Sequence, residues 1–131
     1  MHALDHVSIT VPSIEAARPF YDAIMAALGI AKVYDRPDAL GYGVRCNERE
    51  DDHSYLAVYE SAQVGPDAKR HWCFKAATRA QVTAFHATGL AHGGKDDGAA
   101  GLRPYYHAHY FAAFLLDPCG NRLEAVCHRA E

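Results

Sequence analysis

The sequence predicts an α+β domain in which one structural unit occurs twice. Two observations carry this prediction: a strand-like alternation of polar and apolar residues is twice followed by an amphipathic helix, and the two copies are 65 residues apart. The chain has 131 residues, which is the size of one domain. We therefore treat residues 1–131 as a single domain, with a first module at about 3–62 and a second at about 69–129.

The first unit begins with a strand at residues 6–11. Val7, Ile9 and Val11 share its apolar face, and His6, Ser8 and Thr10 share the other. Ser13 then has the character of a helix N-cap, and Gly29 is the expected stop. Between them, apolar residues recur at helical spacing: Ala17, Phe20, Tyr21, Ile24 and Leu28. Pro19 lies within this helix, so we expect a late start or a kink.

The second unit repeats this order. Residues 71–76 alternate, and Thr78 with Gln81 forms a capping-box pattern before the next helix. The offset of 65 residues pairs His6 with His71, Phe20 with Phe85 and Gly29 with Gly94. Because these matches fall on strand, helix and stop positions alike, they indicate a duplicated unit.

Two or three strands are expected after each helix. In the first unit they are 31–36, 39–46 and 54–60. In the second, 93–104 is predicted to be mostly loop, with 94–96 as a possible short strand. The runs 106–116 and 121–128 are apolar and flank a strong turn signal, Asp117-Pro118-Cys119-Gly120-Asn121.

The composition excludes several classes of function. The net charge is −3 without any run of Lys or Arg, so we expect no nucleic-acid binding. No apolar stretch approaches the roughly 20 residues that span a bilayer, so we expect no membrane insertion. The four cysteines include no C-x-x-C pair, and the first residues do not have the pattern of an export signal. These observations predict reduced thiols and a cytoplasmic location.

Two of the nine histidines fall in register in the repeat, and with one glutamate they form the candidate metal site. His6 and His71 both begin the first strand of their unit. Glu124 lies among apolar residues of the last strand, on the face opposite Leu123 and Ala125. Burying a lone carboxylate is costly, and two imidazoles that hold a divalent cation beside it would offset the cost. The alternative is that the histidines are hydrogen-bonded structural residues and Glu124 lies at an exposed edge.

At these residues the sequence resembles the vicinal oxygen chelate superfamily of glyoxalases, bleomycin-resistance proteins and extradiol dioxygenases. The resemblance rests on LDHVSITV, FYDAIMAALGI and DPCGNRLEAV, and it covers nearly the whole chain. It implies paired βαβββ modules with curved mixed sheets that form a cleft, and one divalent metal ion held by His6, His71 and Glu124. Fe, Mn, Ni, Co and Zn all suit such ligands. It also implies a homodimer, whose sites lie within one chain or are shared between two.

This sequence departs from the family pattern at the fourth ligand position. Family members with four ligands carry a carboxylate or amide in the last strand of the first module. Here the 65-residue offset places Tyr59 at that position, whereas matching Leu56 to Leu123 places Ala57 there. Glu60 points to the other face unless the strand contains a bulge. We therefore expect three protein ligands and open positions for substrate.

The segment before the strand at 106–116 supplies candidate substrate contacts. Arg103 can bind a carboxylate or phosphate, Phe114 is expected to contact the substrate, and Tyr110 can donate a hydrogen bond or act as acid or base. Alternatively, Arg103 is a surface residue and the tyrosines cover the sheet. His107 and His109 would share a face of a regular strand and could bind metal, but we expect them to lie around the site or at the surface instead.

The predicted function is a metal-dependent enzyme that acts on a small molecule chelated through two neighbouring oxygens. It would be a lyase or isomerase, a transferase or a dioxygenase. The alternative is a metal-free protein that sequesters a small molecule, as bleomycin-resistance proteins do. A third possibility is a duplicated scaffold in which these polar residues have only structural roles.

Overall fold

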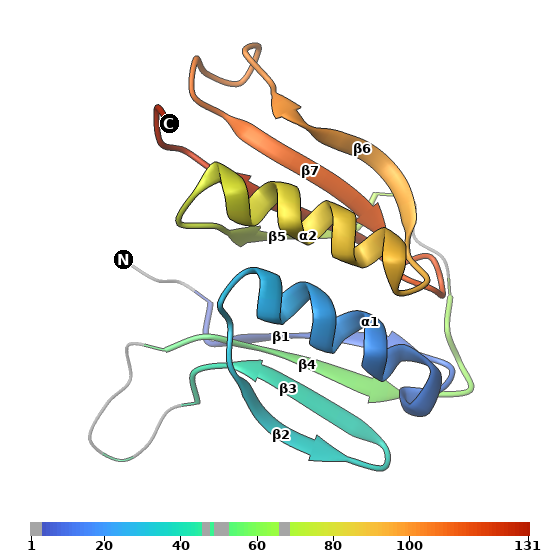
Figure 1. Ribbon diagram of the computed structural model, residues 1–131. Coiled ribbons are helices and arrows are strands. Elements are labelled where there is room, and N and C mark those ends of the chain that lie inside the picture. The colour runs from blue at the N-terminus through green and yellow to red at the C-terminus, as the bar shows by residue number, and fades with distance from the viewer. Residues whose placement is uncertain (1–3, 46–47, 49–52, 66–68) are drawn as a thin grey trace.

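The computed structural model describes residues 4–45, 48, 53–65 and 69–131 and confirms the two tandem βαβββ modules (Figure 1). Among these residues the strands form two separate four-stranded mixed sheets, one in each module. Each sheet has a helix on one face, and the two helices lie next to each other in the middle of the molecule.

Module one has the strand order β1-β4-β3-β2. Strand β1 pairs with β4 in parallel, and β3 runs antiparallel to both β4 and β2. Its elements are β1 (His6–Val11), α1 (Ile14–Ala27), β2 (Lys32–Arg36), β3 (Ala39–Gly43) and β4 (Tyr55–Glu60).

Module two repeats this topology with the order β5-β8-β7-β6. Strand β5 is parallel to β8, while β7 is antiparallel to both β8 and β6. Its elements are β5 (His71–Lys75), α2 (Arg79–Ala91), β6 (Lys95–Leu102), β7 (Phe111–Leu116) and β8 (Arg122–Cys127).

Both predicted helix caps are present. The Ser13 hydroxyl accepts a hydrogen bond from the backbone N–H of Ala16, and Thr78 with Gln81 forms a reciprocal capping box. Helix α1 begins directly after its cap and continues through Pro19, so the predicted late start is wrong. Five residues are already helical when the proline is reached, and packing of the apolar face stabilises the helix beyond it.

The repeat is not uniform at the helix ends. Helix α2 is one residue shorter than α1, so the left-handed residue after it is Gly93, with φ +94°, whereas its counterpart after α1 is Gly29, with φ +71°. The prediction that Gly94 matches Gly29 as the stop is therefore wrong. Gly94 has a packing role instead, because a Cβ atom there would lie 2.5 Å from the ring of Phe20.

The region predicted to be mostly loop is an eight-residue strand, β6. Its register with β7 shifts twice, between Asp96 and Gly98 and again between Gly98 and Gly101. These bulges and glycines interrupt the alternation by which a strand is recognised in a sequence. The predicted strand at 106–116 starts later than expected, at Phe111, because 104–109 forms turns.

The core lies between the helices and the sheets. It contains the apolar faces of β1 and β4, the helix residues Phe20, Tyr21, Ile24 and Phe85, and Leu115 and Leu123 of module two. Gly89 lets the helices approach each other, since a Cβ atom there would lie 3.2 Å from Ile24.

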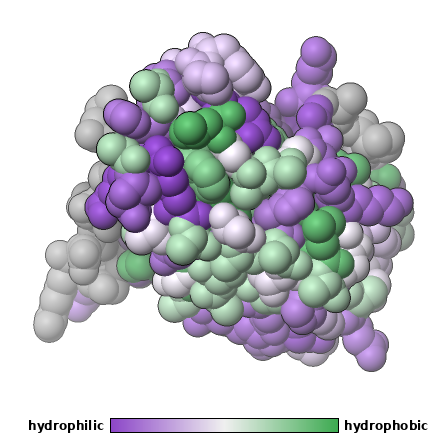
Figure 2. Space-filling model, turned by 45° about the horizontal axis from the view of Figure 1, so that its top comes forward, coloured by the Kyte–Doolittle hydropathy of each residue, from purple (hydrophilic) through white to green (hydrophobic). Residues whose placement is uncertain are grey.

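On the face shown in Figure 2, strongly hydrophobic surface is confined to small patches among polar and weakly apolar residues. Within the described ranges, no helix is long and apolar enough to cross a membrane.

A buried carboxylate in the predicted turn connects the two modules. Asp117 is 1% exposed and accepts a hydrogen bond from the Tyr21 hydroxyl of α1 at 2.5 Å, and others from the backbone N–H groups of Cys119 and Asn121. The side-chain amide of Asn121 donates to the carbonyl of Thr10 in β1 at 3.0 Å. The turn between β7 and β8 is thereby fixed against module one.

The remaining face of each sheet is free of helices and carries the predicted site residues. Because side chains alternate along a strand, the core positions Val7 and Ile9 place His6 and Ser8 on this open face in module one. In module two, His71 and Cys73 occupy the matching positions of β5. We call these surfaces the open face of module one and the open face of module two.

The Tyr21–Asp117 contact predicts a loss of stability in Tyr21→Phe. Removing the hydroxyl leaves a buried carboxylate oxygen with one hydrogen bond fewer, so the free energy of unfolding should fall by about 1–3 kcal/mol in urea denaturation. The control is Tyr105→Phe, at a residue that is 75% exposed, which should behave like wild type. A Tyr21→Phe variant as stable as this control would show that the contact does not stabilise the fold.

Candidate functional site

Glu124 lies at the centre of the open face of module two. It belongs to β8, where its neighbours Leu123 and Ala125 enter the core, so its side chain points to the other side of the sheet. Its register partners are Cys73 of β5 and Phe114 of β7. The residue is only 3% exposed, so its carboxylate has lost most contact with water.

Both carboxylate oxygens of Glu124 have a partner. The Tyr110 hydroxyl donates a hydrogen bond to Oε1 at 2.5 Å, and Nε2 of His71 lies 3.3 Å from Oε2. The predicted residues His71, Glu124 and Tyr110 are thus brought together. A carboxylate buried to this degree requires such partners, because its hydration is otherwise lost without compensation.

The surroundings of Glu124 keep its neighbours protonated. Desolvation and the carboxylate of Glu124 raise the pKa of the Tyr110 hydroxyl well above its ordinary value, and they raise the pKa of the Cys73 thiol in the same way. Part of Cys73 is exposed, but its sulfur faces Glu124. At neutral pH both groups are therefore proton donors, and the thiol is a poor nucleophile.

Arg103 and Tyr110 form the base of the loop at 104–109. The backbone N–H of Arg103 donates to the carbonyl of Tyr110 at 2.7 Å. From there the guanidinium of Arg103 reaches over the ring of Phe114, with its central carbon 5.5 Å from the ring centroid. The predicted substrate contacts Arg103 and Phe114 therefore lie on the same open face as Glu124.

His6 lies on the open face of module one, where neighbouring residues fix its orientation. Its Nδ1–H donates to Asp5 at 2.6 Å, and its ring stacks on Tyr55 with centroids 5.0 Å apart. The other oxygen of Asp5 accepts a hydrogen bond from Nε2 of the buried His53 at 2.7 Å. These hydrogen bonds, that of His6 above all, lower the pKa of Asp5. The contact with Asp5 occupies Nδ1, so Nε2 is the ring nitrogen left to bind a metal ion, as is usual for a metal-binding histidine.

One chain does not assemble all three predicted metal ligands. His71 and Glu124 are together, but His6 does not join them. In residues 4–45, 48, 53–65 and 69–131, no group of three or more His, Cys, Asp or Glu side chains is placed to hold a metal ion. The two parts of the predicted site lie on the open faces of different modules.

The strand register determines which residue of module one matches Glu124. Ser8, the repeat partner of Cys73, pairs with Ala57, just as Cys73 pairs with Glu124. Of the sequence alternatives, Ala57 therefore occupies this position and Tyr59 does not. The β1–β4 register has no bulge, and the carboxylate of Glu60 accepts a hydrogen bond from the backbone N–H of Ile14 at 3.0 Å, at the start of α1.

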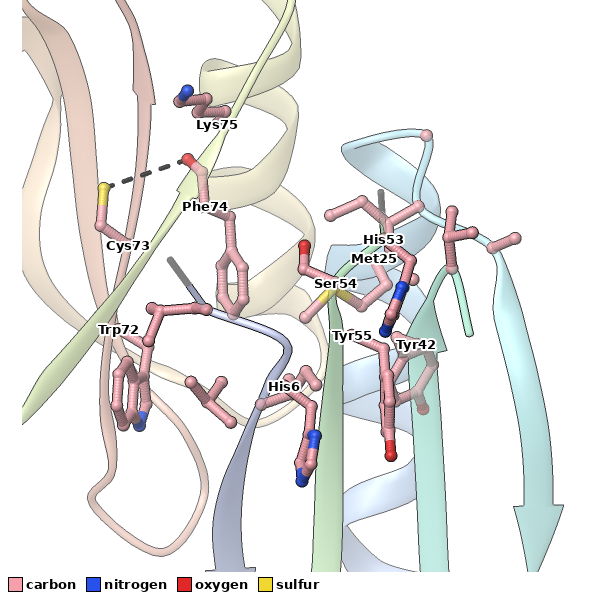
Figure 3. Close-up of a pocket in the computed structure, with 18 residues that line it drawn as sticks. His6, Met25, Tyr42, His53, Ser54, Tyr55, Trp72, Cys73, Phe74 and Lys75 are labelled. Carbon is pink, nitrogen blue, oxygen red and sulfur yellow. Dashed lines mark hydrogen bonds between the residues drawn. The ribbon is translucent and has the colours of Figure 1, made fainter. Parts of the chain in front are cut away.

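A pocket of about 970 Å³ lies between the modules (Figure 3). His6, His53 and Tyr55 line one side of it, and Trp72 and Phe74 of β5 line the other. Figure 3 shows Cys73 on the opposite side of β5 from Phe74, and Cys73 pairs in register with Glu124. Glu124 and His71 do not line this pocket. Cys73, which faces Glu124, also lines this pocket, so the space beside His6 and the surroundings of Glu124 adjoin at β5.

The His71–Glu124 pair fits a divalent cation. Imidazole nitrogen and carboxylate oxygen each bind such ions at about 2.0–2.2 Å, which places two ligands of one ion about 3 Å apart. The observed separation of 3.3 Å is close to this value. Side chains of this kind suit Fe, Mn, Ni, Co and Zn.

Several residues of the site were not predicted from the sequence. Asp5 directly precedes His6, and a carboxylate beside a candidate ligand was a signal for an orienting role. Nothing in the sequence pattern pointed to His53, which follows a polar connecting segment. His128 pairs with His107, with Nε2 of His107 2.9 Å from Nδ1 of His128. The rings of both histidines pack against the edge of the Tyr110 ring, with centroids 5.5 and 5.3 Å away.

Similar solved structures share this architecture. A glyoxalase/bleomycin resistance protein from Albidiferax ferrireducens T118 has 26% sequence identity and a TM-score of 0.78, over 98% of this chain and all of that one. A glyoxalase/bleomycin resistance protein/dioxygenase family enzyme from Burkholderia phytofirmans PsJN has 20% identity and a TM-score of 0.68, over 98% of this chain and 100% of the other. At 20% identity the second shows the fold alone.

The family model agrees with the structural similarity. The chain has no significant match among curated proteins. The model described as Glyoxalase/Bleomycin resistance protein/Dioxygenase superfamily, however, matches residues 3–125, which is nearly the whole chain. This match includes His6, His71, Tyr110 and Glu124. The chain therefore belongs to the glyoxalase/bleomycin resistance protein/dioxygenase superfamily.

Proposed function

We propose that this protein is a divalent-metal-dependent enzyme that acts on a small substrate chelated through two neighbouring oxygen atoms. The observation that carries the proposal is the buried carboxylate of Glu124 with Nε2 of His71 3.3 Å away. A divalent cation bound there would supply a Lewis acid that polarises the substrate oxygens. Open coordination positions would remain for the substrate.

His6 of a second copy of the chain is proposed to complete the site. His6 is half exposed, and Asp5 and Tyr55 fix its ring, so it is ready to bind an ion. Within its own chain it does not meet Glu124. In a two-fold symmetric homodimer, the open face of module one in each copy can lie against the open face of module two in the other, which gives two equivalent sites.

The remaining residues of the open face have distinct roles in this proposal. Tyr110 donates to Glu124 and, because its pKa is raised, supplies a hydrogen bond or a proton rather than accepting one. Phe114 presents an apolar surface next to Glu124. The Cys73 thiol remains protonated and takes no nucleophilic part.

The residue at position 57 bears on the type of reaction. Ala57 occupies the place in module one that Glu124 occupies in module two, so the duplicated position supplies one carboxylate and not two. This arrangement favours a site with two histidines and one carboxylate. It supports a transferase or dioxygenase over an isomerase that relies on a second carboxylate.

The proposal predicts stoichiometric metal binding that depends on Glu124 and His71. Protein purified without chelators should bind one divalent ion per chain. Glu124→Gln and His71→Ala should each weaken binding by about 100-fold or more, at least the effect typical of losing an orienting partner of a ligand. Glutamine preserves the shape of the side chain and can still accept from Tyr110. Zinc and cobalt titrations followed by calorimetry measure the affinity.

Exposed residues of the same types provide the controls. Glu15→Gln and His92→Ala should bind metal like wild type, because both positions are exposed, one in the first turn of α1 and the other at the C-cap of α2. Weak metal binding in the wild type that Glu124→Gln leaves unchanged would contradict the proposal. That result would favour the metal-free sequestering function.

The shared site predicts complementation between chains. A mixture of equal amounts of His6→Ala and Glu124→Gln chains, unfolded and refolded together, should recover tight metal binding at about one quarter of the sites. Half of the dimers are then mixed, and each mixed dimer has one intact site. Neither variant alone should bind tightly. If the mixture also fails although light scattering shows dimers, the sites are not shared in this way.

A further inference from the structure

The guanidinium of Arg103 is held rigidly on the open face of module two. Its Nη1 donates to the carbonyl of Gly101 at 2.9 Å, and its Nη2 donates to the carbonyl of Ala99 at 2.7 Å. Below it lies the ring of Phe114, with its centroid 5.5 Å from the guanidinium carbon. A side chain fixed by two hydrogen bonds and a ring loses little further conformational freedom when it binds a ligand.

The backbone of β6 is shaped to receive this guanidinium. The strand bulges on both sides of Gly98, which has φ +154°, and the second bulge presents the carbonyls of Ala99 and Gly101. A Cβ atom at Gly98 would lie 3.3 Å from Nη2, and one at Gly101 would lie 3.4 Å from Nη1. The absence of side chains at these two positions therefore leaves room for Arg103.

The charge of Arg103 is not neutralised by an ion pair. Across the part of the chain that the structure describes, no carboxylate lies within 4 Å of its nitrogens, whereas Arg122 on the same face pairs with Asp97 at 3.0 Å. Both partners of the Arg103 guanidinium are neutral carbonyls. Its remaining N–H groups can bind a carboxylate, whose charge would be stabilised by the guanidinium.

The position of Arg103 relative to Glu124 limits the kind of ligand. Phe114 is the direct cross-strand partner of Glu124, and Arg103 lies over Phe114. A ligand that reaches both Glu124 and Arg103 must therefore pass along the Phe114 ring. A flat aromatic ring has the shape and the apolar surface for this position.

We propose that Arg103 is an anion-binding residue that selects the substrate. The selected substrate has two neighbouring oxygens at one end and a carboxylate at the other, and the planar ring between them lies over Phe114. The assignment of the oxygen pair to Glu124 and His71 rests on the proposed function. The assignment of the carboxylate to Arg103 rests on the contacts of this residue alone.

Two probes that differ at one substituent test this selection. 3,4-Dihydroxybenzoate carries the carboxylate, and 4-methylcatechol has a methyl group in its place. Calorimetry with zinc-loaded protein should show that the wild type binds the benzoate about tenfold more tightly or better. Arg103→Gln should lose this preference and keep its affinity for 4-methylcatechol, while Arg103→Lys should keep part of the preference. Lys75→Gln, which removes an exposed cation from β5 on the same face, should bind like wild type.

The outcomes separate this inference from the proposed function. If the preference for the benzoate persists in EDTA and zinc changes neither affinity, the metal proposal fails and the role of Arg103 stands. If zinc strengthens binding of both probes equally and Arg103→Gln has no effect on the preference, the role of Arg103 is refuted. It is also refuted if the wild type binds neither probe. A third contrary result is that Arg103→Gln and Arg103→Lys both lower the melting temperature and weaken the binding of the two probes equally. The last result would leave Arg103 as a clamp on β6.

Discussion

The lost hydration of Glu124 is the constraint on which the arrangement of the open face of module two depends. Its carboxylate is almost completely buried, and Tyr110 and His71 stabilise it by approaching its two oxygens. The turns at 104–109 bring Tyr110 to one oxygen, and the start of β5 brings His71 to the other. On the same face, Phe114 lies next to Glu124 as its cross-strand partner, and Arg103 lies over the Phe114 ring.

Duplication produced two open faces that have become different. In module two, the face carries a buried acid and a partly exposed histidine. In module one, the matching acid position is Ala57, and the histidine is instead fixed by Asp5 and Tyr55. Module one thus offers a histidine without an acid, and module two offers one histidine and one acid without a third ligand, which is the basis for proposing that two copies of the chain complete one site. The buried turn at Asp117 holds the two modules of one chain together independently of the site.

The periodic elements and the capped helices could be predicted from the sequence because their signals are local. Ser13, Thr78 and the turn from Asp117 to Asn121 act within a few residues of themselves. Strand β6 could not be predicted, since its bulges and glycines break the alternation. His71 and Glu124 were expected to lie together from the alternation of their strands and from the family resemblance. The role of His53, by contrast, depends on a contact across 48 residues that no local pattern encodes.

Anomalous scattering from crystals of the cobalt-loaded protein tests the central claim most directly. The account predicts one peak per chain, at about 2.0–2.2 Å from a nitrogen of His71 and an oxygen of Glu124, with His6 of a second copy as the third protein ligand. Crystals that hold cobalt elsewhere, with Glu124 still bound only by Tyr110 and His71, would contradict it.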